Sequence, residues 1–287
     1  MDIKIRQFTQ RKPPWIRTKW PQPGEFNRIN NILEKYRINT VCRSARCPNI
    51  GECYSRGHLT FMILGNICTR NCRFCSVPKG DPLPVDANET DRIVEVTGIL
   101  GLREVIITSV TRDDLSDYGA GLFRELIIRL RKRYLGIRIE ILTPDFGGIA
   151  DGGILDASPY IWSHNVETVP RLYGKLRPKA DYWRSLNLVK EIKSKRNDIL
   201  TKSGIMLGLG EKKDEVINVL AHLRDRGIDI VTIGQYLQPA KVNVPVNRFL
   251  PPDEFDWYSN QARAMGFGKV MSAPLVRSSY RGGGREL

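Results

Sequence analysis

All six cysteines of the chain lie between residues 42 and 75, and they form two groups of three. The groups have the spacings C-x4-C-x5-C and C-x3-C-x2-C, and they consist of Cys42, Cys47 and Cys53 and of Cys68, Cys72 and Cys75. Structural disulfides would be spread through a chain of 287 residues rather than gathered at one end. Three thiolates suit a zinc ion with one open coordination position, or a four-iron cluster in which one iron binds another ligand.

The second group favours the iron–sulfur alternative. Zinc knuckles and ribbons usually pair their ligands as C-x2-C, whereas this segment has the sequence CTRNCRFC, with Phe74 just before the last cysteine. It resembles the signature of the radical S-adenosylmethionine (SAM) superfamily. The resemblance implies that Cys68, Cys72 and Cys75 hold a [4Fe-4S] cluster and that the methionine part of SAM binds the fourth iron. The alternative is a structural zinc site or a set of buried thiols.

Strand-like and helix-like segments alternate after the first cysteine group, which predicts a parallel sheet with helices outside it. Strands are expected at Thr60–Gly65, Glu104–Thr108, Ile137–Leu142, Tyr160–Ser163, Ser203–Leu207 and Asp229–Ile233. Helices are expected at Asp86–Leu100, Gly121–Tyr134, Ile149–Asp156, Ala180–Lys195 and Lys213–Arg226. Six strands are two fewer than an eightfold barrel needs. The expected fold class is therefore α/β, a partial (β/α)6 TIM-like barrel of the radical SAM type with N-terminal and C-terminal extensions.

Both flanks of the barrel carry elements of their own. An arm rich in proline and tryptophan precedes an amphipathic helix expected at Phe26–Tyr36. After Gly234 come a proline-punctuated loop, a helix near Asp253–Met265 and a last strand at Lys269–Ala273. These boundaries predict three regions: residues 1–59 as the N-terminal arm with the first cysteine group, 60–235 as the barrel, and 236–287 as a C-terminal extension.

Polar residues recur at the ends of the expected strands, on the side where the second cysteine group lies. In barrels of this kind the carboxyl ends of the strands carry the chemistry. The segment GIMLGLGE, Gly204–Glu211, also resembles the G-x-I-x-G-x-x-E segment of the radical SAM superfamily, in which glycines let the backbone approach a flat adenine. The residues expected to bind SAM are Thr108, Ser109, Glu140, Asn165, Glu167, Arg177 and Met206.

Nearly the whole chain resembles the lipoyl synthase family. The matching segments lie between about residues 12 and 281 and are KPPW, TVC with CPNIGEC, FMILGNICTRNCRFCSVPKG, ITSVTRDDL, SHNVETVPRLY, TKSGIMLGLGE, TIGQYLQP and LVRSSY. The resemblance implies that Cys42, Cys47 and Cys53 hold a second, auxiliary [4Fe-4S] cluster. Its fourth ligand would be a serine of the RSSY motif, Ser278 in this sequence, with Ser279 as the alternative. A serine oxygen is a poor iron ligand beside thiolates, which suits a cluster that is taken apart in the reaction.

The same resemblance implies a reaction. Two sulfur atoms of the auxiliary cluster are inserted at carbons 6 and 8 of an octanoyl chain attached to a lysine of a carrier protein. Each insertion uses one SAM, whose 5′-deoxyadenosyl radical removes a hydrogen atom from an unactivated carbon. The expected catalytic residues are therefore Cys68, Cys72, Cys75 and Ser278. The implied partners are octanoylated lipoyl domains of E2 subunits, the glycine-cleavage H protein, and an electron donor such as ferredoxin or flavodoxin.

The sequence departs from the commoner pattern of that family at three positions. Arg43 and Ser44 stand where acidic residues are frequent, and Tyr54 replaces a frequent tryptophan. None of the three is an expected ligand, so the implied reaction is left intact. These departures are expected instead to change which carrier protein is chosen or how stable the auxiliary cluster is.

The chain is basic, with a formal net charge of +14 and a pI near 9.6. Nucleic acid is not the expected partner, because no RNA-recognition, zinc-finger or helix-turn-helix signature accompanies the charge. An acidic carrier domain would be attracted equally well. The sequence has no apolar run of about twenty residues and no signal peptide, which predicts a cytoplasmic or plastid-stromal protein without membrane contact. A monomer is expected because nothing indicates a symmetric apolar face.

Two alternatives to this function stay open. A methylthiotransferase acting on tRNA also pairs a radical cluster with three further cysteines. Such enzymes usually append a C-terminal RNA-binding β-barrel, whereas only about fifty residues follow the sixth expected strand. A non-enzymatic zinc-binding adaptor, the other alternative, leaves the strand–helix alternation and the RSSY motif unexplained.

Overall fold

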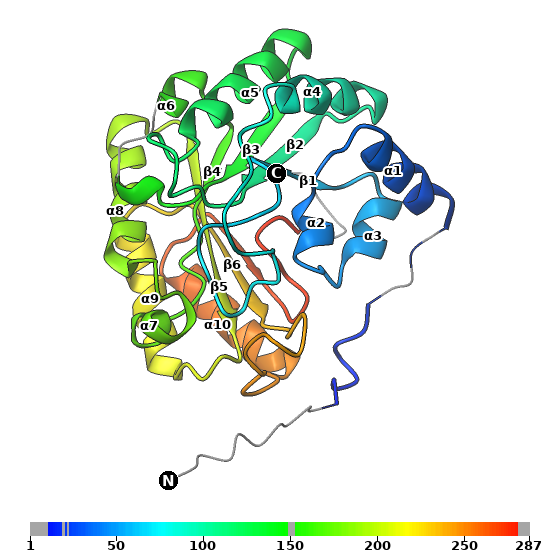
Figure 1. Cartoon of the computed structure of the whole chain (residues 1–287). Coiled ribbons are helices and arrows are strands. Elements are labelled where there is room, and N and C mark those ends of the chain that lie inside the picture. The colour runs from blue at the N-terminus through cyan, green and yellow to red at the C-terminus, as the bar shows by residue number, and fades with distance from the viewer. Residues whose placement is uncertain (1–10, 19–20, 22, 149–152, 281–287) are drawn as a thin grey trace.

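The computed structural model describes residues 11–18, 21, 23–148 and 153–280. Its centre is a seven-stranded parallel sheet in which each strand pairs with the next one along the chain (Figure 1). The strands are β1 Thr60–Ile63, β2 Glu104–Ser109, β3 Arg138–Leu142, β4 Ile161–Ser163, β5 Leu200–Leu207, β6 Ile230–Gln235 and β7 Lys269–Ser272. This order, with a helix outside after most strands, is that of a partial barrel.

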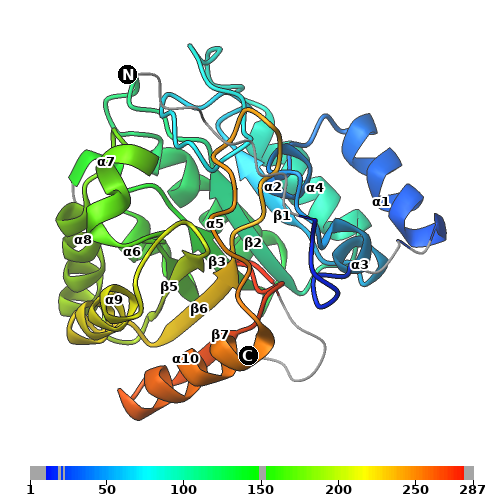
Figure 2. The same ribbon diagram turned by 90° about the horizontal axis from the view of Figure 1, so that it is seen from below.

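Helices cover the outer face of the sheet (Figures 1 and 2). Those within and after the sheet are α4 Glu89–Ile99, α5 Ala120–Arg133, α6 Ile154–Ala157, α8 Tyr182–Lys195, α9 Lys213–Asp225 and α10 Pro252–Ala264. Those before it are α1 Pro23–Lys35, α2 Val41–Ser44 and α3 Ile50–Ser55, and the short turns are η1 Phe146–Gly148, η2 Pro170–Leu172 and α7 Tyr173–Leu176. In the described part of the chain, no helix is both long and apolar enough to cross a membrane.

The expected α/β fold class is confirmed, with two differences in detail. The strand expected at Ser203–Leu207 begins three residues earlier, at Leu200. The last expected strand is β7, which pairs in parallel with β6, so the sheet has seven strands rather than six. Of the helix expected at Ile149–Asp156, residues 149–152 lie outside the described residues, and the remainder belongs to α6.

Amphipathic helices supply the core on the outer side of the sheet. In α5 the buried residues follow helical spacing and are Phe123, Leu126, Ile127 and Leu130. All four residues of β1 are buried, because helices cover one face of the strand and the barrel interior encloses the other. Burying each large apolar side chain contributes about 1.5 to 3 kcal/mol, so this layer fixes the positions of the strand ends.

The N-terminal arm holds the first cysteine group against β1. Two residues of α1, Ile29 and Leu33, are fully buried, and the ring of Phe26 lies 5.7 Å from that of Tyr54 in α3. The backbone N–H of Met62 in β1 donates to the carbonyl of residue 39 at 2.9 Å. The short helices α2 and α3 are thereby fixed beside the first strand (Figure 2).

The C-terminal segment approaches the sheet closely at two glycines. A Cβ atom at Gly234 would lie 2.1 Å from the carbonyl oxygen of Val276, and one at Gly204 would lie 3.0 Å from Oγ of Ser278. Any larger residue at Gly234 would collide with backbone. These glycines of β5 and β6 therefore let the RSSY segment lie against the barrel.

Candidate functional site

The second cysteine group lies on the loop that follows β1. The backbone turns at Leu64 and Gly65, whose φ angles are 68° and 87°. The carboxylate of Glu89 fixes this turn, because it accepts hydrogen bonds from the N–H groups of Leu64 at 2.7 Å and Gly65 at 3.4 Å. The loop then closes where the N–H of Cys68 donates to the carbonyl of Pro78 at 2.8 Å. The group is thus held at the carboxyl end of the strand, as the sequence predicts.

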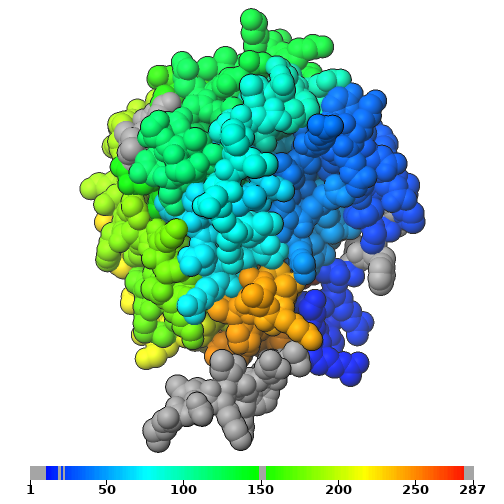
Figure 3. Space-filling view, in the orientation of Figure 1, coloured from blue at the N-terminus to red at the C-terminus, as the bar shows by residue number. Residues whose placement is uncertain are grey.

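A neighbouring loop supports the same cysteines from the other side. The side-chain amide of Asn243 donates to the carbonyls of Arg73 at 3.1 Å and Cys75 at 2.9 Å. In the space-filling view the cysteine loop, in cyan, lies between the N-terminal arm and the segment that follows β6 (Figure 3). The second cysteine loop is therefore exposed on this face and fixed along its border by Asn243 of the segment that follows β6.

Two thiols of the second group, those of Cys72 and Cys75, lie where burial disfavours the thiolate form. Burial is the main cause that raises the pKa of Cys72 and Cys75, to about 11 for Cys75, and neighbouring thiolates of the same group add to it. The charge of Arg177 acts against this rise at Cys72. Ligand thiols must be deprotonated, so a cationic iron centre would add positive charge to that of Arg177 and favour the thiolate form.

The first group is carried by the two short helices. Cys42 lies in α2 and Cys53 in α3, and the N–H of Cys47 between them donates to the carbonyl of Cys42 at 3.0 Å. Burial is the main cause that raises the pKa of Cys42 and Cys53 to about 12 each, and the other thiols of this group contribute to that rise. In each group the thiols that raise these pKa values are members of that same group. The six cysteines therefore form two separate sites.

The RSSY segment reaches the first group from the far end of the chain. The side-chain amide of Asn49, between two of the cysteines, donates to the carbonyl of Leu275 at 2.7 Å. Burial raises the pKa of Cys47, and the nearby guanidinium of Arg277 opposes that rise. Ser279 lines the same cavity as the three cysteines. The juxtaposition of C-x4-C-x5-C with RSSY, more than 200 residues apart, agrees with the implied ligand set.

Ser278, the serine first expected as a ligand, points elsewhere. Its Oγ accepts a hydrogen bond from Nδ2 of Asn165 at 2.5 Å. Ser279 lies among the cavity residues, and Ser278 does not. Ser279 thus faces the cavity that the three cysteines also line, and the identity of the serine ligand stays a prediction.

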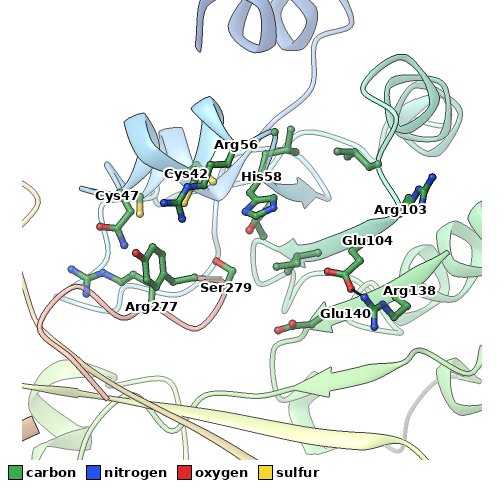
Figure 4. Close-up of a pocket in the computed structure, with 18 of the residues that line it drawn as sticks. Cys42, Cys47, Arg56, His58, Arg103, Glu104, Arg138, Glu140, Arg277 and Ser279 are labelled. Atoms are coloured by element: carbon green, nitrogen blue, oxygen red, sulfur yellow. Dashed lines mark ion pairs between the residues drawn. The ribbon is translucent and has the colours of Figure 1, made fainter. Parts of the chain in front are cut away.

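The cavity that the first cysteine group and Ser279 line has a volume of about 1100 Å³. It lies at the amino ends of the strands, since its wall includes Thr60, Glu104, Arg138 and Lys269, the first residues of β1, β2, β3 and β7. Figure 4 shows Cys42, Cys47, Arg277 and Ser279 on one side of it and Glu104, Arg138 and Glu140 on the other. It is thus at the opposite end of the strands from the second cysteine group.

The donor set of each cysteine group, three thiols, fits a four-iron cluster that has one iron open to another ligand. All six are free thiols. A zinc site needs three or four ligands converging about 2.3 Å from one ion. Within the described residues, no group of three or more histidine, cysteine or acidic side chains is arranged to hold a single metal ion. A four-iron cluster binds each thiolate to a separate iron, so three thiols can hold three of its irons.

Three of the residues expected to bind SAM lie beside the second group. Nδ2 of Asn165 donates to Glu167 at 3.0 Å. Glu167 and Arg177 both act on the pKa of Cys72, in opposite directions, so both charges lie near that thiol. Burial raises the pKa of Glu167 itself, and Arg177 opposes that rise. Nε of Arg177 is buried and has no hydrogen-bond partner among the described residues.

Three others lie at the carboxyl ends of β2 and β5. Oγ1 of Thr108 donates to the carbonyl of Leu142 at 2.9 Å. Oγ of Ser109 is buried and has no partner within residues 11–18, 21, 23–148 and 153–280. Met206 is the register partner of Gly234 near the end of the sheet. All three therefore occupy the end of the barrel that carries the second cysteine group.

The expected position of Glu140 at a strand end is wrong. Glu140 is the third of the five residues of β3, and its carboxylate pairs with Nζ of Lys202 at 2.6 Å. Both residues line the cavity of the first cysteine group. No sequence pattern indicates this pairing, because the partner Lys202 lies 62 residues away on a part of β5 that is too polar to be predicted as strand.

A charged cluster that was not predicted from the sequence fastens the second cysteine loop to the barrel. The guanidinium of Arg70, within CTRNC, donates to Asp145 at 2.6 Å and to Asp113 at 2.8 Å. Arg70 is 7% exposed and Asp145 is 1% exposed. The sequence did contain a signal for this cluster, because an aspartate follows each of two predicted strands: Asp113 in TRDD and Asp145 in TPDF.

The amino-acid sequence of this chain is similar to that of known proteins. The sequence model of the radical SAM superfamily matches residues 62–223. A lipoyl synthase of Caldanaerobacter subterraneus subsp. tengcongensis is 51% identical over 275 residues, which are 95% of this chain and 96% of that protein. A lipoyl synthase of Thiobacillus denitrificans is 49% identical over 279 residues, which are 96% of this chain and 90% of that protein.

A solved structure shows the same fold at low sequence identity. The crystal structure of Streptococcus suis SuiB bound to S-adenosylmethionine matches with a TM-score of 0.57 and 13% identity, over 77% of this chain and 52% of that chain. At this identity the match concerns the fold alone, and it agrees with the partial barrel described above. The curated relatives make the protein an enzyme of the radical SAM sulfurtransferase type. The chain therefore belongs to the lipoyl synthase family of the radical SAM superfamily.

Proposed function

We propose that this enzyme inserts two sulfur atoms into a protein-bound octanoyl-lysine, at carbons 6 and 8, to form the lipoyl group. The sulfur comes from an auxiliary [4Fe-4S] cluster, and SAM at a second [4Fe-4S] cluster initiates each insertion. One observation carries the proposal: three cysteines and a serine of the RSSY motif line a single cavity, which lies apart from the loop that carries the other three cysteines.

The second cysteine group is the proposed SAM site. Cys68, Cys72 and Cys75 would bind the cluster through their sulfur atoms. When bound, cluster and SAM supply a radical that takes a hydrogen atom from an unactivated carbon. Glu167 and Arg177 provide opposite charges beside Cys72, as the ammonium and carboxylate groups of SAM require. Their burial strengthens these interactions, since the local dielectric constant is low.

The neighbouring polar residues are proposed to hold the nucleoside part of SAM. Asn165, Thr108 and Ser109 provide an amide and two hydroxyls at this end of the barrel, and Met206 provides an apolar contact near Gly204. Glu140 is left out of the SAM site, because its carboxylate is committed to Lys202 in the other cavity.

The first cysteine group is the proposed site of the sulfur donor, which is consumed as a substrate. Cys42, Cys47 and Cys53 would hold it together with a serine, and Ser279 is preferred to Ser278 because it lines the cavity. In each insertion one C–H bond is replaced by a C–S bond, and the hydrogen leaves on 5′-deoxyadenosine. An oxygen ligand binds iron weakly beside thiolates, which would ease the release of sulfur.

The carrier protein has to supply much of the binding free energy. Six buried methylenes contribute about 5 kcal/mol at about 0.8 kcal/mol each, which is near millimolar affinity before ordering costs. Acidic lipoyl domains of E2 subunits and the glycine-cleavage H protein would add electrostatic attraction to a chain of net charge +14. We further propose that ferredoxin or flavodoxin supplies electrons, that the enzyme acts as a monomer, and that residues 1–59, 60–235 and 236–287 form its three functional regions.

The test uses anaerobically reconstituted protein. Iron and sulfide are counted per chain before and after incubation with SAM, a reductant and an octanoyl-lysyl peptide, and the product mass is recorded. About eight irons, as two four-iron clusters require, and a mass gain of two sulfurs are expected. A matched Cys53→Ala variant should keep SAM cleavage and lose sulfur insertion. Only about four irons in the unaltered protein, or methylthiolated RNA as the product, would overturn the proposal.

A further inference from the structure

The loop that carries the second cysteine group lies at the surface of the molecule. Its three cysteines are only half-buried. The residues on either side of Cys72, which are Asn71 and Arg73, are exposed. Figure 3 shows this loop, in cyan, on one face of the molecule, with the segment that follows β6, in orange, beside it. The second cysteine group is thus close to solvent, at the opposite end of the strands from the cavity of the first group.

Two lysines are fixed beside this loop by hydrogen bonds. Nζ of Lys179 donates to the carbonyl of Thr69, within the loop, at 3.0 Å. Lys79 forms a parallel bridge with Cys68, whose N–H and C=O bond the backbone on either side of that lysine at 2.8 and 3.1 Å. Both lysines are exposed, so two positive charges border the loop.

Two further cations come from the loop itself and from the segment after β6. The backbone carbonyl of Arg73 accepts hydrogen bonds from the N–H of Val244 at 3.2 Å and from Nδ2 of Asn243 at 3.1 Å. The two residues before Asn243 are Lys241, which is exposed, and Val242, which is 91% exposed. A bare apolar side chain therefore lies beside the cations.

The four cations around the loop are called the loop patch: Arg73, Lys79, Lys179 and Lys241. None of them forms an ion pair with any residue that the structure describes. The acidic residues within two positions of them in the sequence are Asp81 and Asp181, and Asp181 is engaged at the start of α8, where it accepts from the N–H of Arg184 at 2.6 Å. The loop patch therefore keeps an excess of positive charge, which attracts an acidic protein surface.

We propose that the loop patch docks an acidic electron-transfer protein, whose one-electron redox centre lies near its own surface. This inference rests on the proposed function, in which a protein donor supplies electrons to the second cysteine group. Electron transfer slows steeply with distance, so such a donor has to dock over this loop. The octanoylated carrier, by contrast, has its proposed site in the cavity at the opposite end of the strands.

The surface has the properties of a transient electron-transfer interface. Complexes of that kind are small and weak, with charged groups around a limited apolar contact, and here the cations surround Val242. The donor loses one electron to the cluster site of the loop and leaves in its oxidised form. That electron is consumed when SAM splits into methionine and the 5′-deoxyadenosyl radical, so the donor has to bind once for each SAM.

The test measures equilibrium binding of a fluorescently labelled, oxidised ferredoxin of acidic composition to the reconstituted enzyme. SAM and reductant are left out, so that no turnover occurs. In the double variant Lys79→Glu with Lys241→Glu, two cations of the loop patch become anions. Its Kd for ferredoxin should rise about tenfold or more at about 50 mM salt. At about 300 mM salt the difference between variant and unaltered enzyme should shrink, because salt screens exposed charges.

A matched control separates the loop patch from the overall charge. The double variant Lys132→Glu with Lys190→Glu changes the net charge by the same amount, at exposed positions of α5 and α8. It should leave the Kd for ferredoxin within about twofold of the unaltered value, because rim charges act mainly where the partner docks. Thermal unfolding and iron content check that each variant is folded. If the first double variant does not fold, Lys241→Glu alone, outside the cysteine loop, should still weaken binding several-fold.

The outcomes separate this proposal from the proposed function. The docking site is overturned if the unaltered enzyme does not bind ferredoxin, if the folded patch variants bind it as tightly as the unaltered enzyme, or if the control weakens binding equally. It is also overturned if the patch variants lose affinity for an octanoylated carrier domain instead, which would make the patch a carrier site. Insertion of two sulfurs with a chemical reductant in any of these cases leaves the proposed function standing. Patch-dependent binding of ferredoxin without any sulfur insertion would overturn the function alone.

Discussion

Two adjacent serines of the C-terminal motif have different surroundings, and this difference predicts different roles. Ser279 shares the cavity with three cysteines, whereas Oγ of Ser278 is bonded to the Asn165 amide at 2.5 Å. Asn165 in turn bonds Glu167 beside the second cysteine group. Ser279 is thus the serine that we propose as the ligand of the auxiliary cluster, and Ser278 links the C-terminal segment to the proposed SAM site.

We expect Ser279→Ala to lose iron from the auxiliary site, because the cluster would keep only thiolate ligands on three of its four irons. After brief treatment with a chelator, iron should fall from about eight per chain toward about four, while SAM cleavage continues. Ser278→Ala is the matched neighbour and should keep its iron. The assignment to Ser279 is wrong if the two variants behave in the opposite way.

At the scale of elements, the second cysteine loop depends on residues that follow two other strands. Arg70 of the loop is held by Asp113, after β2, and by Asp145, after β3. Burial alone would raise the pKa of Asp145, but the hydrogen bond and charge of Arg70 outweigh it and lower the pKa to about 2. The loop is therefore anchored by an ion pair that persists at neutral pH.

Asp145→Asn should destabilise the protein, since it leaves the buried Arg70 without one of its charge partners. The loss should be about 3 kcal/mol at neutral pH, measured by urea unfolding of the cluster-free protein. The carboxyl of Asp145 has a lowered pKa in the folded state, so its contribution is present above its unfolded pKa of about 4 and is lost as the pH falls toward 2. The difference between variant and unaltered protein should shrink over that interval.

An exposed pair serves as the control for this measurement. Asp86 binds Arg92 at 2.7 Å, and the Asp86 side chain is 52% exposed. Solvent screens such pairs, so Asp86→Asn should change stability little. A loss as large as that of Asp145→Asn would mean that burial is not what makes the anchor strong.

At the scale of the whole molecule, the net charge of +14 is part of the proposed attraction between the enzyme and its carrier protein. Part of the charge lies at the cavity, where Arg103, Arg138 and Lys269 line the wall at the amino ends of the strands. Opposite charge on a partner raises the rate of encounter, and salt screens this effect over about 8 to 10 Å at ordinary ionic strength.

We therefore expect activity on an octanoylated carrier domain to fall more steeply with salt than activity on an octanoyl-lysyl peptide. Between about 50 and 300 mM salt, KM for the domain should rise several-fold, while kcat stays nearly constant. The peptide, which lacks the acidic surface of the domain, serves as the control. Equal salt dependence for both substrates would show that the charge does not guide the carrier.

Much of the fold and of the cysteine chemistry follows from the sequence, because both are local. Cys68, Cys72 and Cys75 lie within eight residues of one another, so the sequence alone predicts that their thiols share one site. The apolar periodicity of segments such as α5 sets helices, and short apolar runs set strands, whatever the rest of the chain does. The order of strands and helices then leaves a parallel sheet as the natural arrangement.

Only the tertiary structure decided which distant groups meet. The polar start of β5 was not predicted as strand, since Thr201 and Lys202 can be buried only when partners such as Glu140 satisfy them. The choice between Ser278 and Ser279 likewise depends on how the C-terminal segment passes Gly204 and Gly234. Contacts between residues far apart in the chain carry no periodic signal, so their geometry is fixed by packing and by the hydrogen bonds that buried polar groups require.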